Sequence, residues 1–420
     1  MGKFREIVLL ELKALVRSRT LALLLIASIA WMLVFPRIVR GDGTAESVRE
    51  LTVHFSLGGV FALLVVALLA SATGSLARER TAKRLQLTLV RPVRSSVIVL
   101  GKLLAHVVVG VLVLAVACGI LAGQNDLGAR CYSVLSPILP SPREEAKVMY
   151  EAYMKDPATP EAVKKTKKEI VLRLLENRAA DHFQTLPTNA VTTWKFPLCP
   201  TASDVRVRMR FAAQYDTRQD VRGRFRIGDC QGVVSNITQA VLTIPLISQT
   251  SQTSQTQDRL SFVNEGMNAL MLRPRKDINV LVGADGFGWN LVRAYAVLVA
   301  LLAAVVAFGL FLSAGLGRPV ALFVAFVTLA VSEMSPSVLE QYPDELETKA
   351  IDRIGLVLTR CVASATKPLS AVSPLEALAK DERVEPSSVI RLAAVDLVAV
   401  PLVLALLSAL VLPRKQDDLV

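Results

Sequence analysis

The chain has 420 residues, of which 52% are hydrophobic, and a formal net charge of +12. Soluble domains are about 45–50% apolar, so the apolar fraction alone does not distinguish a membrane protein from a soluble one. However, apolar runs of about 17–25 residues, long enough to span a bilayer, occur at both ends of the chain. The basic residues flank these runs and have no aromatic platform beside them. This arrangement excludes nucleic acid as the partner and favours anchoring on the cytoplasmic side of a membrane.

The first 19 residues predict an amphipathic helix that precedes the membrane spans. Helical spacing places five apolar residues on one face, which are Phe4, Val8, Leu12, Leu15 and Val16. Most of the basic residues of this stretch fall elsewhere on the helix. A helix with this division lies in the membrane interface.

Residues 20–122 predict three membrane spans. These are Thr20–Pro36, His54–Gly74 and Leu103–Ala122. Because the N-terminal helix and the loop before the third span are strongly basic, the positive-inside rule places both in the cytoplasm. The chain then leaves the cytoplasm at the end of the third span. Lys102 and His106 stand at the start of that span, where we expect both side chains to snorkel towards the interface.

Segment 77–102, between the second and third spans, has a more regular arrangement of residues than is needed to hold a loop on the cytoplasmic side by its positive charge. Glu79 opens it, leucines give it a brief apolar face, and Pro92 breaks it before the next span. We expect it to be a docking surface for a cytoplasmic partner. The residues expected to make this contact are Glu79, Arg80, Arg84, Leu85, Leu87, Arg91, Pro92, Arg94 and Lys102.

Residues 123–288 predict a soluble α+β domain that is rich in strands. A helical hairpin comes first, formed by Pro142–Lys155 and Pro160–Arg178. Four stretches with alternating apolar residues then predict strands, which are Val205–Phe211, Val221–Ile227, Ala240–Ile247 and Ile278–Val282. Strands of this length and pattern favour a small antiparallel sandwich or barrel.

The topology exports this domain, which bears on its cysteines. Cys131, Cys199 and Cys230 all fall within it. An oxidising compartment permits disulfides. If one forms, we expect the pair to be Cys199 and Cys230, and three unpaired thiols are an equal alternative.

Residues 289–420 predict three further spans. The fourth is Leu291–Ala314, the fifth is shorter and ends near Met334, and the last is Leu392–Leu412. Segment 337–386 separates the last two and contains an amphipathic helix, Leu346–Ala365, which either stays outside the bilayer or dips into it. The predicted fold is an α-helical polytopic membrane protein with about six transmembrane helices, both termini in the cytoplasm, and an inserted extracytoplasmic domain.

The sequence offers little catalytic apparatus. It contains neither a G-x-S-x-G motif nor a G-x-x-x-x-G-K-[ST] phosphate loop, and its three histidines lack metal-ligand spacing. We therefore expect no enzyme activity, no metal and no cofactor in this chain. Asp396 is the notable intramembrane polar residue. A carboxylate in a span often marks function, but near a helix end it can also simply sit in the interface or meet a neighbouring span, and we favour this second interpretation.

The membrane portion resembles the permease subunits of type-2 ATP-binding-cassette exporters. The resemblance rests on the N-terminal amphipathic helix and on four motifs of segment 77–102, which are Glu79-Arg80-Thr81, Leu85-Gln86-Leu87, Arg91-Pro92-Val93-Arg94 and Leu100-Gly101-Lys102. It implies that this segment is the coupling helix that sits in a groove of a separate ATPase subunit, which binds the ATP. Family members commonly carry Gly where Ala82-Lys83-Arg84 stands here, and domain 123–288 lies outside the family core.

The resemblance further implies a homodimer or heterodimer of permeases in the plasma membrane, the inner membrane of a bacterium, and makes segment 337–386 an outer-face re-entrant element. Our leading hypothesis is an ATP-driven exporter. The alternative is a non-transporting membrane anchor or sensor whose exported, periplasmic domain scaffolds an envelope partner. An intramembrane enzyme is disfavoured by the absent catalytic set. Mostly aliphatic spans indicate a lipid-like or amphipathic cargo, or mechanical work on a partner.

Overall fold

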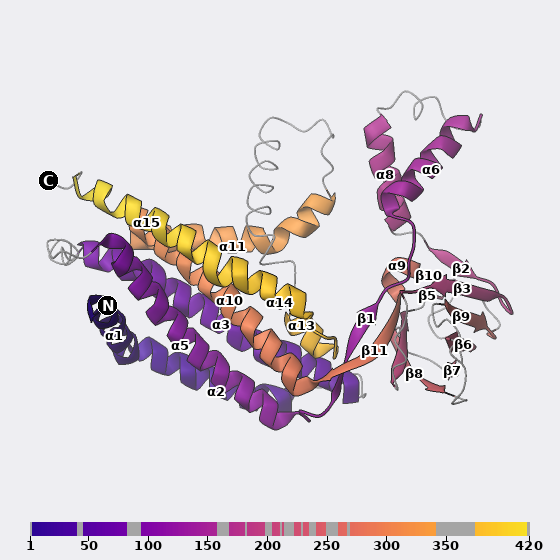
Figure 1. Cartoon of the computed structure of the whole chain (residues 1–420), viewed down its shortest axis with the longest axis horizontal. Helices are drawn as coiled ribbons and strands as arrows, with labels where there is room; N and C mark the ends of the chain where they lie inside the picture. The colour runs from indigo at the N-terminus through magenta and orange to yellow at the C-terminus, as the bar shows by residue number, and fades with distance from the viewer. Residues whose placement is uncertain are drawn as a thin grey trace. The chain divides into compact units, whose positions relative to one another are not determined.

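A computed structural model gives the fold, which is mostly helical with a β-containing region (Figure 1). The chain forms two compact units, one made of Met1–Ala129 and Asp285–Val420, the other of Arg130–Ala284. The structure describes residues 2–39, 45–81, 94–157, 168–180, 183–197, 204–210, 212–213, 222–227, 230–234, 241–248, 259–266, 269–341 and 374–417.

Four helical stretches of the first unit are long and apolar enough to cross a membrane, within the described part of the chain. They lie in α3 (Ala45–Thr81), α5 (Ser95–Gln124), α10 (Phe287–Gly315) and the continuous run α14 (Pro386–Leu392), η1 (Ala393–Ala399) and α15 (Val400–Asp417). This protein therefore has the helices of a membrane protein.

Two further helical regions decide how many spans there are. Helices α1 (Gly2–Arg17) and α2 (Arg19–Ile38) are long and apolar enough to cross a membrane only when they are taken together. The pair is bent by 64° and would add a fifth span. The apolar part of α11 (Arg318–Gln341), Arg318–Val331, is shorter than the others. Within the described residues, four or five helical stretches are thus long and apolar enough to cross a membrane. The expected number of six spans stays a prediction.

Helix α10 is the centre of the helical unit. It packs against α3, α5 and α15. In its most apolar stretch of 18 residues 72% is buried, compared with 28–44% in the corresponding stretches of the other three candidate spans. From residue 294 onward its sequence is apolar on nearly all sides, as is typical of a helix surrounded by other helices. Small residues such as Ala303, Ala307 and Gly309 let neighbouring helices come close. In Figure 1, α10 runs between α3 and α15.

Helix α1 forms where it was predicted. Of the five residues on its predicted apolar face, Leu15 is buried within the helical unit, whereas Phe4 and Val16 are exposed together with Leu9 and Leu10. A helix beside lipid can be apolar on its outer side as well, so the apolar stripe does not by itself identify the face that packs against protein.

Segment 77–102 begins in α3 and ends in α5. The latter starts at Ser95, eight residues before the predicted span, so the last part of the segment is helical. Arg94 is its N-cap residue, and Arg80 lies in the last turn of α3. The predicted contact residues between them, Arg84, Leu85, Leu87, Arg91 and Pro92, lie outside the described residues.

The polypeptide before α14 is held against α10. The Asn290 side chain, buried in α10, donates to the Glu382 carbonyl at 2.8 Å and accepts from the Val384 amide at 2.8 Å. Helix α13 (Pro374–Ala379) precedes this anchor and packs against α3 and α10. The predicted helix Leu346–Ala365 lies outside the described residues.

The second unit, Arg130–Ala284, includes a helical hairpin. Helix α6 (Pro142–Lys155) begins with a capping box between Ser141 and Glu144, and α8 (Lys168–Ala180) packs against it. The capping hydrogen bonds stabilise the carboxylate, so they lower the pKa of Glu144. Ala146 contacts Val171 and Leu175 in a small core of its own.

Two sheets make up the rest of this unit. The larger has the order β1-β11-β4-β8-β7-β6-β9-β3 and the smaller β2-β10-β5. Their strands are β1 (Arg130–Leu135), β2 (Gln184–Leu186), β3 (Val191–Lys195), β4 (Val205–Arg210), β5 (Ala212–Ala213), β6 (Gly223–Ile227), β7 (Cys230–Val234), β8 (Val241–Ser248), β9 (Arg259–Asn264), β10 (Leu270–Leu272) and β11 (Ile278–Gly286). The short helix α9 (Pro274–Asp277) precedes β11.

Residues of both sheets share one apolar core. Strand β4 shows why: Val205, Val207 and Met209 are buried, and the arginines between them face the other way. Strands β4, β6, β8 and β11 fall where alternation predicted them. The proposed Cys199–Cys230 disulfide is untested, because Cys199 lies outside the described residues and the Cys230 side chain is not described.

Candidate functional site

Lys102, in the second turn of α5, binds two carboxylates at once. Its Nζ donates to Glu11 Oε2 of α1 at 2.8 Å and to Glu79 Oε1 of α3 at 2.8 Å. The Lys102 side chain is 3% exposed, against 13% for Glu11 and 34% for Glu79. We call these three residues the charge triad. It joins three helices through one ammonium group.

The burial of Lys102 corrects the expectation that this side chain snorkels. Snorkelling needs an open path from the helix to water, and α1 packs against α5 at this point. The ammonium is stable there because both carboxylates reach it with short, charge-assisted hydrogen bonds. The triad holds one positive and two negative charges, so removing its only cation would be costly.

Gly101 allows α1 to approach α5 this closely. A Cβ atom at this position would lie 2.8 Å from Ile7 Cγ2 and 3.7 Å from Val8 Cγ2. The first distance is shorter than any ordinary carbon–carbon contact. The absence of a side chain at Gly101 therefore lets α1 settle on α5 beside Lys102.

We expect Gly101→Leu to push α1 away from α5 and to weaken the triad. The free energy of unfolding of the full chain in detergent should fall by about 1–3 kcal/mol, the usual cost of overpacking. The matched control is Gly119→Leu in the same helix, where a Cβ atom would meet nothing within 4 Å. Equal destabilisation by the two substitutions would contradict this view of the contact.

His106 lies one turn further along α5 and is fully buried, so the expectation that it snorkels is also wrong. Its Nδ1 lies 2.8 Å from the Lys102 carbonyl oxygen, which can only accept, so Nδ1 donates. In the neutral ring Nε2 then accepts from the Ser71 hydroxyl of α3, at 3.2 Å. His106 thus adds a second polar link between α3 and α5.

The triad brings together two of the predicted contact residues, Glu79 and Lys102, which stand near the two ends of segment 77–102. Sequence reasoning did not single out its third member, Glu11. A signal was present, since Glu11 follows Val8 by three residues and precedes Leu15 by four, and so shares their helical face. A carboxylate on a packed face needs a partner.

Asp396 is a separate candidate. It lies in η1, a π-helical turn within the last long helix, and is 1% exposed. Its Oδ2 has no hydrogen-bond partner among the described residues, and η1 packs against α10. It therefore faces the helix bundle rather than the interface. π-Helical turns are frequent at functional sites.

A polar cluster in the sheet unit is held together by its own members and reads as structural, with Arg206 Nε 3.6 Å from Asp204 Oδ1 in an ion pair. The buried Tyr132 hydroxyl donates to Asp204 Oδ2 at 3.0 Å, and the Arg206 guanidinium lies over the Tyr132 ring, 4.6 Å from its centroid. Burial, and then the bond to Asp204, raise the pKa of Tyr132 to about 12. The hydroxyl therefore stays protonated at physiological pH and serves as a fixed donor.

No group of three or more metal-ligating side chains occurs within the described part of the chain. Comparisons with protein-family models, with curated proteins and with solved structures find no match to this chain.

Proposed function

We propose that this chain is the permease subunit of an ATP-driven exporter of the ATP-binding-cassette class, and that segment 77–102 is the docking surface for a separate ATPase subunit. The observation that carries the proposal is the charge triad. Glu79 and Lys102 belong to the two ends of the segment, and the same ammonium group binds Glu11 of α1. The resemblance of the segment to coupling helices supplies the kind of partner.

The triad gives a physical route from the segment to the spans. If the ends of a docking segment were loose, they would absorb a push from the partner. Here the ends are tied to each other and to α1, and both α3 and α5 pack against the central helix α10. A displacement of the segment would therefore move these helices together, as in the rigid-body changes of other switching proteins.

The full proposal includes the topology expected from the sequence. It comprises about six spans with both termini in the cytoplasm, a dimer of permeases in a bacterial inner membrane, and an extracytoplasmic unit between the third and fourth spans. Segment 337–386 would form an outer-face re-entrant element. The anchor of Val384 on Asn290 supports a fixed position for the end of that segment.

Co-purification tests the docking role. The full chain, purified from its native membranes, should bring with it a protein that carries a G-x-x-x-x-G-K-[ST] phosphate loop. Reversing Arg80, Arg84 and Arg91 to glutamate should lower its recovery at least about tenfold, because charged contacts steer and hold such interfaces.

The matched control reverses three exposed basic residues of α6 in the sheet unit, Arg143, Lys147 and Lys155, which should leave recovery unchanged. Failure to recover any such ATPase with the unaltered chain, or equal recovery with the reversed segment, would overturn the proposal.

The alternative of a non-transporting anchor or sensor is favoured by one observation, the compactness of Arg130–Ala284 as a unit of its own. A gene for an ATPase beside the gene for this chain would favour the exporter over the anchor.

A further inference from the structure

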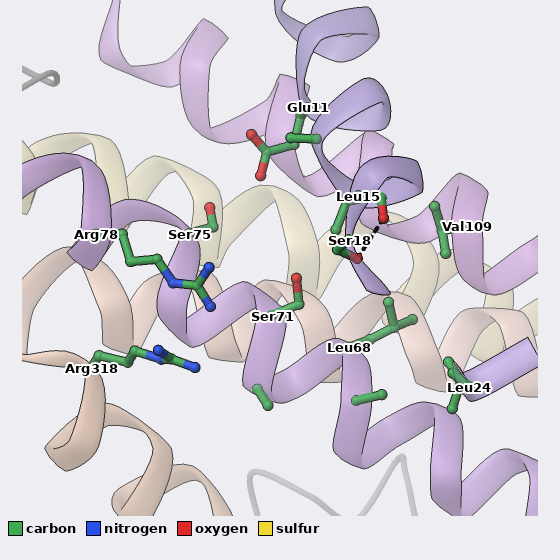
Figure 2. Close-up of a pocket in the computed structure, with 13 residues that line it drawn as sticks. Glu11, Leu15, Ser18, Leu24, Leu68, Ser71, Ser75, Arg78, Val109 and Arg318 are labelled. Atoms are coloured by element: carbon green, nitrogen blue, oxygen red, sulfur yellow. Dashed lines mark hydrogen bonds between the residues drawn. The ribbon is translucent and has the colours of Figure 1, made fainter. Parts of the chain in front are cut away.

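A pocket of about 290 Å³ opens among α1, α2, α3, α5 and α11, next to the charge triad (Figure 2). All these helices belong to the first unit. Its walls combine charged, hydroxyl-bearing and apolar side chains, and the lining includes Glu11, Leu24, Leu68, Ser75, Arg78 and Arg318. Neither segment 77–102 as a docking surface nor Asp396 accounts for this pocket.

Two guanidinium groups meet at one end of the pocket. Arg78 comes from α3 and Arg318 from the start of α11, and the Nε atoms of both lie 3.2 Å from the point where a Cβ atom of Gly74 would stand. The two nitrogens are therefore within twice that distance of each other. Neither guanidinium makes a hydrogen bond or ion pair with any residue that the structure describes. Like charges this close repel each other, so the pair is suited to an anion between them.

A hydroxyl group at the same end also lacks a partner. Ser75 Oγ is buried and makes no hydrogen bond within the described residues. Burying a hydroxyl without a partner is unfavourable. A phosphate group has enough oxygens to accept from this hydroxyl and from both guanidiniums. The carboxylate of Glu11 also lines the pocket and shares the Lys102 ammonium with Glu79, each at 2.8 Å, so the triad sets one net negative charge against the two positive charges of the guanidiniums.

The other end of the pocket is apolar. Figure 2 shows Arg78 and Arg318 on one side and Leu24, Leu68 and Val109 on the other, with Ser71 between them. A free inorganic anion would make no favourable contact with the apolar wall. An amphiphile would use both ends. The volume of about 290 Å³ accommodates a headgroup and the beginning of one acyl chain, and the rest of the chain would lie in the bilayer.

We propose that this pocket binds one anionic phospholipid, with its phosphate between Arg78 and Arg318, its phosphate oxygen accepting from Ser75, and an acyl chain along Leu24 and Leu68. A net negative headgroup fits best, because two unpaired cations face it and a zwitterionic headgroup would bring a third positive charge. The proposal goes beyond the exporter function and does not depend on it.

Native mass spectrometry of the full chain in detergent tests the proposal. Three probes are added separately: phosphatidylglycerol, phosphatidylcholine and inorganic phosphate. We expect one tightly held phosphatidylglycerol, bound at least about tenfold more strongly than phosphatidylcholine, and no competition by inorganic phosphate. Arg78→Gln with Arg318→Gln should remove this preference.

Two further variants make the result decisive. Gly74→Leu keeps both charges but places a side chain between them, since even its Cβ atom would lie 3.2 Å from the Nε atoms of both arginines, and it should also remove the preference. Arg37→Gln with Arg391→Gln removes the same charge outside the pocket lining and should preserve it. Equal binding of the two lipids, or preference retained in both pocket variants, would overturn the proposal. Displacement by inorganic phosphate would identify the free anion as the ligand instead.

Discussion

Lys102→Met is expected to lower the free energy of unfolding of the full chain by about 3 kcal/mol, at the lower end of the cost of removing one partner from a buried ion pair. Methionine preserves the length and apolar stem of lysine. The loss arises because Glu11 and Glu79 are left beside each other without a cation. We choose the lower end because Glu79 is 34% exposed and so keeps part of its hydration. Chemical denaturation in detergent measures the change.

Two companion variants separate the triad from a general effect of losing a lysine. Lys380→Met removes the ammonium of a more exposed pair, that with Glu376, and should cost less than about 1 kcal/mol. Glu11→Gln added to Lys102→Met removes one of the two stranded charges and should restore part of the stability. If Lys102→Met costs no more than Lys380→Met, the triad does not hold the helices together.

Asp396→Val is expected to raise the free energy of unfolding by about 1–3 kcal/mol, because the Asp396 side chain is buried and its Oδ2 has no partner among the described residues. Asp396→Asn, which keeps the shape and leaves a polar group, should stabilise the chain less. Thermal unfolding of the three proteins in the same detergent measures the order.

A destabilising Asp396→Val would contradict this account, since it would mean that the carboxylate has a partner in the assembled protein. Stabilisation with loss of export would instead indicate that the residue is kept for function at the expense of stability.

The long apolar helices could be read from the sequence because length and composition alone define them. Helix α10 was expected at Leu291–Ala314 and is found at Phe287–Gly315, since its run from residue 294 to residue 312 contains no charged residue. Strand β4 was equally clear from its alternating valines and arginines. Short strands such as β2 and β5 were not foreseen, because two or three residues carry no measurable period.

The site was predicted only in part, and the charge triad shows why. Sequence pattern placed Glu79 and Lys102 at the two ends of segment 77–102, but nothing in one sequence says that Glu11, about 90 positions from Lys102, reaches the same ammonium group. The role of Gly101 in helix packing likewise becomes visible only in the structure, where Ile7 lies opposite it. Contacts between distant helices depend on packing, and packing is not a property of a local pattern.

The central claim is that segment 77–102 contacts an ATPase subunit, and site-specific photo-cross-linking in native membranes tests it most directly. A photoreactive residue in place of Leu87 should form a cross-link to a protein with a G-x-x-x-x-G-K-[ST] phosphate loop. The same residue in place of Leu410, an exposed side chain of α15, should not. A cross-link of this kind from Leu87 alone is the predicted result. Its absence from Leu87, or its equal formation from Leu410, would contradict the claim.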